Sequence, residues 1–220
     1  GFLEYLLPKL ESHFESVSNL LFIPYARPGG ISYSAYTSIV REALINLPLS
    51  VQGIHEFENP VKALKDAEAI YIGGGNTFVL MDSLIKAGLM DLIKDKVETG
   101  TPYLGTSAGS NIVGPTVKTT NDMPIVHPES LESLGLIPFN INPHYLDPDP
   151  DSTHKGETRE TRIKEFHAYN DTSVIGLREG SWIEVNGSKS ILKGPLTESN
   201  LNSNSTQFEI SQESHLNEIL

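Results

Sequence analysis

The sequence predicts an α/β protein with a mainly parallel sheet, and two patterns lead to this prediction. Short apolar runs, typical of buried strands, alternate along the first half with segments that have the apolar spacing of helices. The runs that end at Ile72 and Gly105 lead into turns of small residues that open the next helix. The order strand, turn, helix is the pattern of a parallel sheet covered by helices. At 220 residues, the chain is long enough for one domain with a sizeable core and short for two.

The elements of the first half follow this alternation in order. Residues 2–14 have helical spacing, although Pro8 is expected to kink that helix. A further helix is expected to start at Ala108. The other predicted helices cover residues 34–45, 61–65, 78–86 and 89–97, and the predicted strands cover residues 20–24, 51–55, 69–72 and 103–105.

The second half is less regular. Residues 156–167 have helical spacing, and three short runs are expected to form antiparallel strands: 173–177, 182–185 and 190–192. Asn186-Gly187 is a strong hairpin signal between the last two. Residues 196–220 hold four Glu and no Lys or Arg. We therefore expect a single domain over residues 1–195, followed by a polar acidic tail that is loosely attached.

Composition excludes several classes of function. The formal net charge is −12, from 16 Lys and Arg against 28 Asp and Glu, so we expect no nucleic-acid and no membrane partner. No apolar run approaches the roughly 20 residues that span a bilayer, and no secretory leader is visible. The absence of cysteine excludes thiolate chemistry and is compatible with a reducing compartment. A cytoplasmic protein is the expectation.

The segment Gly105-Thr-Ser107-Ala-Gly109 matches the Gly-x-Ser-x-Gly nucleophile elbow. It lies between a predicted strand and a predicted helix, which is the context that this motif requires. Small residues on both sides let the chain turn sharply and lift the Ser107 hydroxyl above the sheet. The backbone amide of Ala108 then points at the same space, where it can bind a developing oxyanion.

The segment Gly73-Gly74-Gly75 also ends a strand and opens a helix. It is open to three interpretations: a phosphate cradle, a second oxyanion donor near Gly75, or a tight turn that needs positive φ. No Lys-Ser or Lys-Thr follows, so nucleotide binding is weakly supported. We favour the oxyanion donor, because ligands bind at the carboxyl ends of strands in open α/β sheets.

A serine nucleophile needs a base, and seven histidines are available. His144 is favoured, because it follows an apolar run and precedes a proline-rich loop, with His127 and His154 as rivals. The acid that orients the imidazole is Asp122 or Glu179, and spacing does not decide between them.

Two charged clusters have alternative interpretations. Lys155, Arg159 and Arg162 form either an exposed helix face or a clamp for a substrate carboxylate. The run from Asp147 to Asp151 fails the calcium-loop signature, because Gly and Glu are missing at positions six and twelve. A solvated acidic loop is expected there, and no metal site.

Five segments, in order along residues 20–195, resemble peptidase E, the α-aspartyl dipeptidase family. They are Ile72-Gly-Gly-Gly-Asn-Thr-Phe78, Gly105-Thr-Ser-Ala-Gly109, Thr119-Thr-Asn-Asp-Met-Pro-Ile-Val126, Ile141-Asn-Pro-His144 and His154-Lys-Gly-Glu-Thr-Arg-Glu160. The resemblance implies a three-layer, flavodoxin-like sandwich of the class I glutamine-amidotransferase type, with a small antiparallel part near the C-terminus. It also implies hydrolysis of small dipeptides with N-terminal aspartate by a serine nucleophile, with no metal and no cofactor.

Residue by residue, the resemblance makes Ser107 the nucleophile and His144 its histidine. Gly75 and Ala108 match the oxyanion donors. Arg159 falls in a matching segment and is expected to hold the aspartyl carboxylate of the substrate.

For the acid, the resemblance leaves both residues in place. Asp122 matches the position usually given to the charge relay, and Glu179 matches a glutamate proposed from structure. The sequence departs from the family pattern in two places. Family members have an apolar first strand before the segment at which this chain starts, so that strand is expected to be missing. Residues after Pro195 do not follow the family's closing strands.

Two alternative functions stay open. One is a cyanophycinase-like serine peptidase that acts on another aspartyl substrate, and the other is a non-catalytic relative that binds acidic metabolites. For the dipeptidase, we expect a small closed pocket and a monomer or homodimer.

Overall fold

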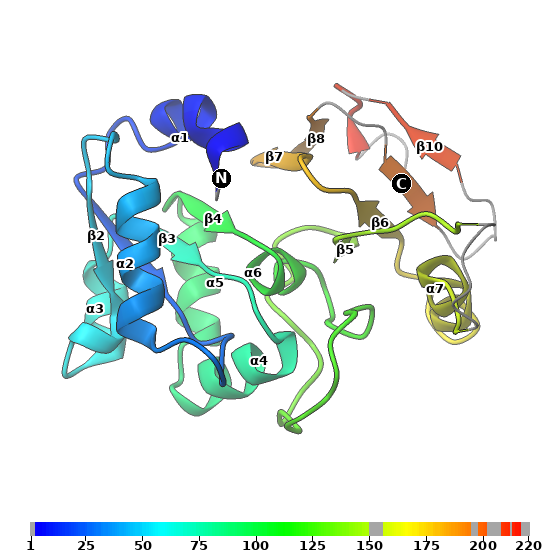
Figure 1. Cartoon of the computed structure of the whole chain (residues 1–220), viewed down its shortest axis with the longest axis horizontal. Coiled ribbons are helices and arrows are strands. Elements are labelled where there is room, and N and C mark those ends of the chain that lie inside the picture. Colours follow the sequence, from blue (N-terminus) through cyan, green and yellow to red (C-terminus); the bar gives the residue numbers. More distant parts are fainter. Residues whose placement is uncertain (1–2, 150–155, 195–197, 202–207, 212, 217–220) are drawn as a thin grey trace.

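Two four-stranded sheets organise the protein and lie next to each other (Figure 1). The computed structural model describes residues 3–149, 156–194, 198–201, 208–211 and 213–216. The first sheet is entirely parallel, in the order β2-β1-β3-β4. Its strands are β1 (Asn19–Ile23), β2 (Ser50–Gly53), β3 (Ala69–Ile72) and β4 (Tyr103–Gly105). The predicted α/β class with a mainly parallel sheet is confirmed.

Helices cover both faces of this first sheet, because its strands send alternate side chains into two apolar cores. Leu20 and Phe22 of β1 belong to one core, and Leu21 and Ile23 belong to the other. Residues of α1 (Leu7–His13) and α2 (Tyr33–Ala43) complete the first core. Residues of α3 (Pro60–Asp66), α4 (Thr77–Lys86) and α5 (Met90–Glu98) complete the second. The result is the predicted three-layer arrangement.

The first helix differs from the expected kinked helix over residues 2–14. A 3-10 turn, η1 (Glu4–Leu6), precedes α1, and Pro8 lies in the first turn of α1. Proline is tolerated there, because amides of the first helical turn have no intrahelical acceptor. Pro8 therefore lies where a helix starts, and the predicted kink is wrong.

The second sheet has the order β10-β9-β6-β5. Its strands are β5 (Asn140–Pro143), β6 (Val174–Leu177), β9 (Glu198–Leu201) and β10 (Phe208–Ile210). β6 was expected to be antiparallel, but it pairs in parallel with β5 and antiparallel only with β9. The helix α7 (Arg159–His167) connects β5 to β6 and packs Ile163 against Tyr145 and Val174. A helical crossover of this kind is what a parallel pair requires.

Two segments of the predicted tail are part of this second sheet. β9 pairs with β6, and β10 pairs with β9. The side chains of Ile210 and Leu216 are buried in the same core as Ile141 and Ile175. For these segments the prediction of a loosely attached tail is wrong. The polar composition of residues 196–220 obscured a few apolar residues that cover one end of the core.

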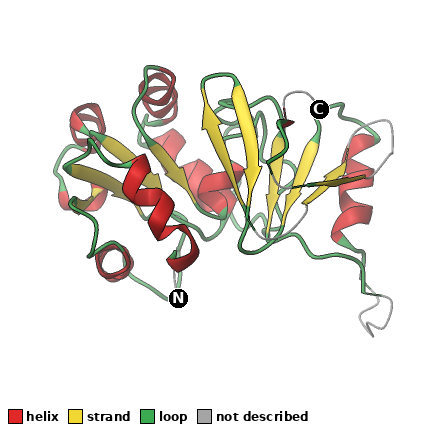
Figure 2. Cartoon of the chain, turned by 90° about the horizontal axis from the view of Figure 1, so that it is seen from above, coloured by secondary structure: helices red, strands yellow, loops and turns green. Residues whose placement is uncertain are grey.

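A hairpin of β7 (Trp182–Asn186) and β8 (Lys189–Lys193) forms a separate two-stranded sheet that lies between the two larger sheets (Figure 2). The predicted hairpin is present, but Asn186 is the last residue of β7 and pairs with Lys189, so the turn consists of Gly187, at a φ of 57°, and Ser188. The Trp182 ring lies 6.3 Å from that of Tyr5, and Lys9 of α1 pairs with Glu184 at 3.2 Å. The N-terminal helix and the hairpin therefore face each other across the two halves.

In the part of the chain that the structure describes, no helix is both long enough and apolar enough to cross a membrane.

Candidate active site

Ser107 occupies a strained turn between β4 and α6 (Ala108–Asn111). Its φ of 52° and ψ of −110° are rare for a residue with a side chain, and such strain persists only where the surroundings enforce it. Behind the turn, Tyr103 donates a hydrogen bond to the carbonyl of Gly109 at 2.6 Å. Burial raises the pKa of the Tyr103 phenol, so it stays a donor. The predicted elbow is present, although its helix is only one turn long and ends ahead of Pro115.

The glycines on both sides of Ser107 are required by backbone contacts. A Cβ atom on Gly105 would overlap the carbonyl of Gly109, and one on Gly109 would overlap the carbonyl of Ile72. The two ends of the elbow therefore pack directly against each other and against the end of β3. This contact is the physical reason for glycine at both positions.

Replacing Gly109 with alanine is expected to destabilise the fold. The new Cβ would overlap rigid backbone, so we expect a loss of about 3 kcal/mol, roughly a 10 °C drop in Tm for a chain of this size. Thermal unfolding monitored by circular dichroism measures it. Gly29→Ala is the matched control, because a Cβ on Gly29 meets nothing within 4 Å. Equal Tm values for the two variants would contradict the packing argument.

Gly75 presents a backbone amide beside the elbow. The neighbouring amides of Gly74 and Asn76 donate to the Tyr36 hydroxyl at 2.9 Å and to the Ala26 carbonyl at 2.7 Å. Among the described residues, none accepts a hydrogen bond from the Gly75 amide. Gly75 has a φ of 142°, and a Cβ on it would overlap Ala26, so this position requires glycine. The tight-turn and oxyanion interpretations of this segment are therefore compatible.

The amide of Ala108 is the other expected oxyanion donor. Ala108 is the first residue of α6, where an amide has no intrahelical acceptor. The Cβ that Gly74 lacks would come within 2.8 Å of the Cβ of Ser107, so the glycine turn packs closely against the nucleophile elbow. The glycine turn and the nucleophile elbow thus form two adjacent walls of the proposed oxyanion site.

His144 and Glu179 form a hydrogen-bonded pair through His144 Nδ1 and Glu179 Oε1. They follow β5 and β6, whose parallel register places Pro143 opposite Leu177. His144 has a φ of 54°, a second strained residue at this edge. The side chains are 51% and 73% exposed, so both are open to a ligand.

Among the described residues, no hydrogen bond joins Asp122 to His144. Its carboxylate accepts a hydrogen bond from the backbone amide of Thr77 at 2.7 Å and from the Thr120 hydroxyl at 3.0 Å. Thr77 is the first residue of α4, so Asp122 satisfies an amide at the start of that helix. Of the two acids that the sequence left open, the structure brings Glu179 to His144.

The loop that holds Asp122 also contacts the histidine-bearing strand. The Asn142 side-chain amide donates to the Thr119 carbonyl at 2.7 Å, and that of Asn121 donates to the Pro143 carbonyl at 3.0 Å. We call residues 119–122 the bridging loop, because they contact α4 of the first half and β5 of the second. Sequence reasoning did not identify Asn121 as part of the site.

Replacing Asp122 with alanine is expected to cost stability more than activity. It removes an acceptor from the Thr77 amide, for which we expect about 1–2 kcal/mol and a Tm lower by roughly 5 °C. We expect kcat/KM to fall about tenfold at most, through displacement of the adjacent glycine turn. Thermal unfolding and initial rates measure the two effects. Asp66→Ala, which removes an exposed ion pair with Lys62, is the control and should change neither.

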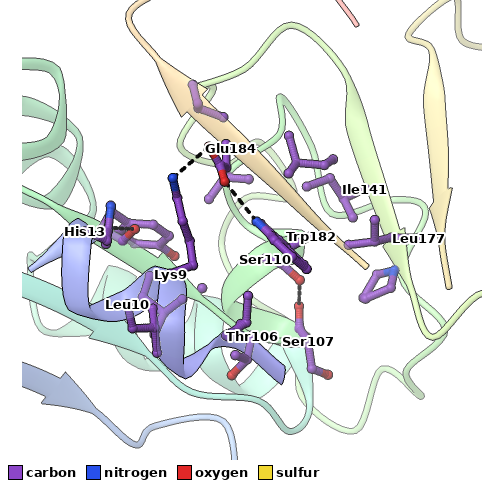
Figure 3. Close-up of a pocket in the computed structure, with 18 of the residues that line it drawn as sticks. Lys9, Leu10, His13, Thr106, Ser107, Ser110, Ile141, Leu177, Trp182 and Glu184 are labelled. Carbon is purple, nitrogen blue, oxygen red and sulfur yellow. Dashed lines mark hydrogen bonds and ion pairs between the residues drawn. The ribbon is translucent and has the colours of Figure 1, made fainter. Parts of the chain in front are cut away.

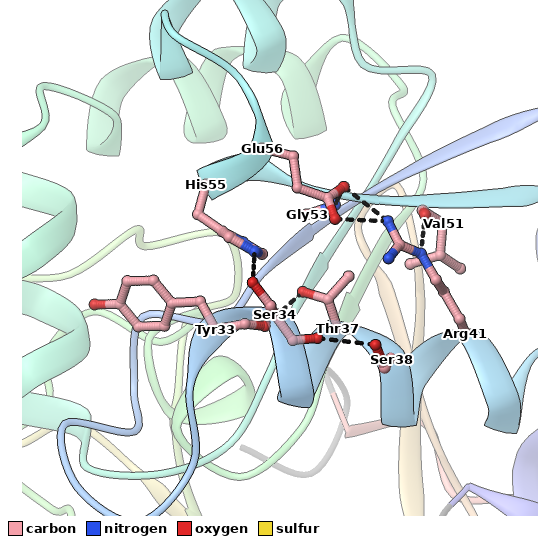
Figure 4. Close-up of polar contacts among 9 residues, drawn as sticks. All are labelled: Tyr33, Ser34, Thr37, Ser38, Arg41, Val51, Gly53, His55 and Glu56. Atoms are coloured by element: carbon pink, nitrogen blue, oxygen red, sulfur yellow. Dashed lines mark hydrogen bonds and ion pairs between the residues drawn. The ribbon is translucent and has the colours of Figure 1, made fainter.

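The other histidines have different surroundings. His55 contacts the hydroxyl of Ser34 at 3.2 Å, beside the Arg41–Glu56 ion pair, on the face of α2 drawn in Figure 4. His127 is exposed, and His154 lies outside the described residues. Two further histidines bond to backbone carbonyls: His13 to Tyr103 at 3.1 Å and His167 to Asn170 at 3.2 Å. His215 lies in the predicted tail and forms an isolated bridge with Ile191.

A cleft of about 1210 Å³ contains Ser107, Gly75, His144 and Glu179 along its walls. Figure 3 shows Ser107 and Ser110 on the side of the elbow, and Trp182 of the hairpin also lines the cleft. The expected small closed pocket is therefore wrong: the space between the two halves is a wide cleft. Within the described chain, no hydrogen bond joins Ser107 to His144.

Arg159 contacts the residue that precedes His144. Its Nη1 donates to the Pro143 carbonyl at 3.3 Å, and partial burial, with the nearby charge of Arg162, lowers the pKa of its guanidinium. It is absent from the cleft lining, and Lys155 of the same predicted cluster lies outside the described residues.

The remaining predictions for charged residues concern ion pairs near Arg159 and a metal site in the run from Asp147 to Asp151. The structure pairs Glu160 with Lys164, and Asp147 with Arg178 at 2.6 Å. Asp151 lies outside the described residues. Over the ranges that the structure describes, no group of three or more His, Cys, Asp or Glu is arranged to hold a metal ion.

A strained serine at a strand-to-helix turn, beside free backbone amides and a His–Glu pair, is the arrangement of α/β serine hydrolases. Comparison with known proteins agrees with this class and defines it further. Residues 1–193 match the model of peptidase family S51, and the chain belongs to that family.

Similar proteins include "Peptidase E" of Streptomyces coelicolor, which is 48% identical over 88% of this chain and 79% of its own. "Probable alpha-aspartyl dipeptidase" of Drosophila melanogaster is 48% identical over 88% of this chain and 81% of its own. Among solved structures, a putative peptidase E of Listeria monocytogenes has a TM-score of 0.68 at 23% identity, over 88% of this chain and 95% of its own. A peptidase of an acI-B1 actinobacterium has a TM-score of 0.71 at 19% identity, over 96% and 93%. These two structures share the fold.

Proposed function

We propose that the protein is a serine-type dipeptidase that hydrolyses dipeptides with N-terminal aspartate. The observation that carries this proposal is the strained Ser107 in a cleft that it shares with the His144–Glu179 pair. Family membership supports peptide hydrolysis, and the names of the relatives, peptidase E and α-aspartyl dipeptidase, support the substrate.

In the first half of the reaction, Ser107 is the nucleophile and His144 is the general base. His144 Nε2 takes the hydroxyl proton while Oγ attacks the peptide carbonyl, and the amides of Gly75 and Ala108 receive the oxyanion. Glu179 accepts from Nδ1, which leaves Nε2 as the base and stabilises the imidazolium that forms. Catalytic hydrogen bonds are often long in a free enzyme, so contact between Ser107 and His144 is expected to tighten when substrate binds.

In the second half, the peptide C–N bond breaks as His144 returns its proton to the leaving amine. The aspartyl group is then held as an ester on Ser107. A water molecule, deprotonated by His144, attacks this ester and releases aspartate, and the proton returns to the Ser107 oxygen.

Arg159 is the residue that we propose to hold the aspartyl side-chain carboxylate. Its hydrogen bond to the carbonyl of Pro143, the residue before His144, supports this role. Its guanidinium is also partly desolvated, and such a group binds carboxylate strongly. Because Arg159 does not line the cleft of the free protein, its side chain is expected to turn toward the substrate.

Three further points belong to the proposal. Residues 1–195 carry all the proposed catalytic groups, the protein acts in the cytoplasm, and it is a monomer or homodimer. The absence of cysteine is compatible with a reducing compartment.

The proposal is tested by rates of hydrolysis for a panel of peptides. Asp-Leu should be cleaved, whereas Asn-Leu, Leu-Asp and Asp-Leu-Leu should be cleaved at least about 100-fold more slowly. A β-linked aspartyl-arginine dipeptide tests the cyanophycinase-like alternative. Faster release from the β-linked substrate, or no turnover of any peptide, would overturn the proposal.

A further inference from the structure

Three Lys or Arg side chains line the cleft in the part of the chain that the structure describes: Lys9, Arg27 and Arg178. Lys9 pairs with Glu184 at 3.2 Å, and Arg178 binds Asp147 through two hydrogen bonds of 2.6 and 2.9 Å. Arg27 has no carboxylate partner among the described residues. Its charge is therefore available to a ligand in the cleft.

Arg27 is held close to the glycine turn by one contact of its own and by two contacts of its neighbours Tyr36 and Ala26. Its guanidinium carbon lies 5.0 Å from the centre of the Tyr36 ring, a cation–π contact. The hydroxyl of that ring accepts from the Gly74 amide at 2.9 Å. The preceding residue, Ala26, accepts from the Asn76 amide at 2.7 Å. These contacts orient an exposed cation beside the proposed oxyanion site.

We propose that Arg27 binds the C-terminal carboxylate of the dipeptide substrate, an inference that rests on the proposed function. An Asp-X dipeptide carries two carboxylates, and Arg159 is assigned to the one on the aspartyl side chain. The other lies one residue beyond the scissile carbonyl, about 4 Å away, so it must fall near the elbow. Arginine matches a carboxylate with two parallel hydrogen bonds.

This assignment gives a physical basis for a preference for dipeptides in a wide cleft. A longer peptide has a neutral amide at the position where the dipeptide has a carboxylate. Arg27 would then be left without its anionic partner, and the enzyme would lose a charge-assisted contact. Selection by length would thus come from charge recognition and not from a closed wall.

The test crosses two variants with three substrates. Asp-Leu has both carboxylates, Asp-leucinamide lacks the C-terminal one, and Asn-Leu lacks the side-chain one. Arg27→Met should lower kcat/KM for Asp-Leu by about 10- to 100-fold, mostly through KM, and should change that for Asp-leucinamide by less than about threefold. Arg159→Met should lower kcat/KM for Asp-Leu and for Asp-leucinamide, which both carry the side-chain carboxylate. It should leave kcat/KM for Asn-Leu unchanged, because that substrate lacks this carboxylate.

Three controls make the test specific. Arg27→Lys, which keeps the charge without the planar fork, should recover part of the loss. Lys65→Gln removes one positive charge from α3, away from the cleft, and should leave all rates unchanged. Thermal unfolding confirms that each variant is folded.

The outcomes are separable. An equal loss for Asp-Leu and Asp-leucinamide in Arg27→Met would assign Arg27 to the packing of Tyr36 and overturn the inference. A loss that disappears only for Asn-Leu would assign it to the aspartyl side chain and also overturn it. Failure of the wild-type protein to cleave Asp-Leu is seen before any variant is compared, and it would overturn the proposed function together with this inference.

Discussion

Ser107→Ala is expected to abolish the hydrolysis of Asp-Leu, with kcat/KM lowered by about 10⁴-fold or more. Without Oγ no ester forms, and the free amides of Gly75 and Ala108 alone supply little rate enhancement. The substitution removes one oxygen atom and keeps the strained φ of 52°, so the fold should be retained. Initial rates of leucine release, together with thermal unfolding, measure both effects.

Ser34→Ala is the matched control for this variant. Ser34 is a second serine in contact with a histidine, His55, at 3.2 Å, but it lies on α2 outside the cleft. Its loss should leave the rate within about twofold of wild type. Turnover of Asp-Leu at the wild-type rate by Ser107→Ala would remove Ser107 from the mechanism.

Glu179→Gln is expected to lower kcat by about 10²- to 10³-fold. The change keeps the side-chain shape but removes the charge that fixes the His144 tautomer and stabilises the imidazolium. A buried aspartate in this role is worth about 10⁴-fold. The smaller figure is expected here because Glu179 is largely exposed to water, which screens its charge. Steady-state kinetics with Asp-Leu measure the loss.

Two matched carboxylates control for this result. Glu184→Gln changes another carboxylate of the cleft, one that pairs with Lys9, and should alter kcat by less than about threefold. Asp122→Asn keeps an oxygen that can accept from Thr77 and should also stay close to wild type. A larger loss in Asp122→Asn than in Glu179→Gln would reverse the assignment of the acid.

The first half of the fold was predictable from sequence because its signals are local. Each strand is followed along the chain by its own helix. The overlaps that require glycine at positions 105 and 109 arise within the elbow and the adjacent end of β3. The second half was less predictable, because its pairing joins distant segments. Nothing in the sequence around β6 indicates that its parallel partner is β5, or that residues after Pro195 supply two more strands.

The same distinction applies to the site. Ser107 and Gly75 belong to recognisable local motifs, and His144 follows a rigid strand end. The choice of acid was open because 35 residues separate His144 from Glu179, and only the pairing of β5 with β6 brings them together. Arg27 was missed, although its place just beyond the end of β1, at the ligand-binding edge of a parallel sheet, was a usable signal.

The proposed nucleophile and its base belong to different sheets, and this division has a mechanical consequence. Ser107 follows a strand of the first sheet, and the His144–Glu179 pair follows strands of the second, with the bridging loop between them. A relative slip of one ångström between reacting groups costs about 100-fold in rate, yet it need not alter a single helix or strand. The turnover rate should therefore report the spacing of the two sheets far more sensitively than any measure of secondary-structure content.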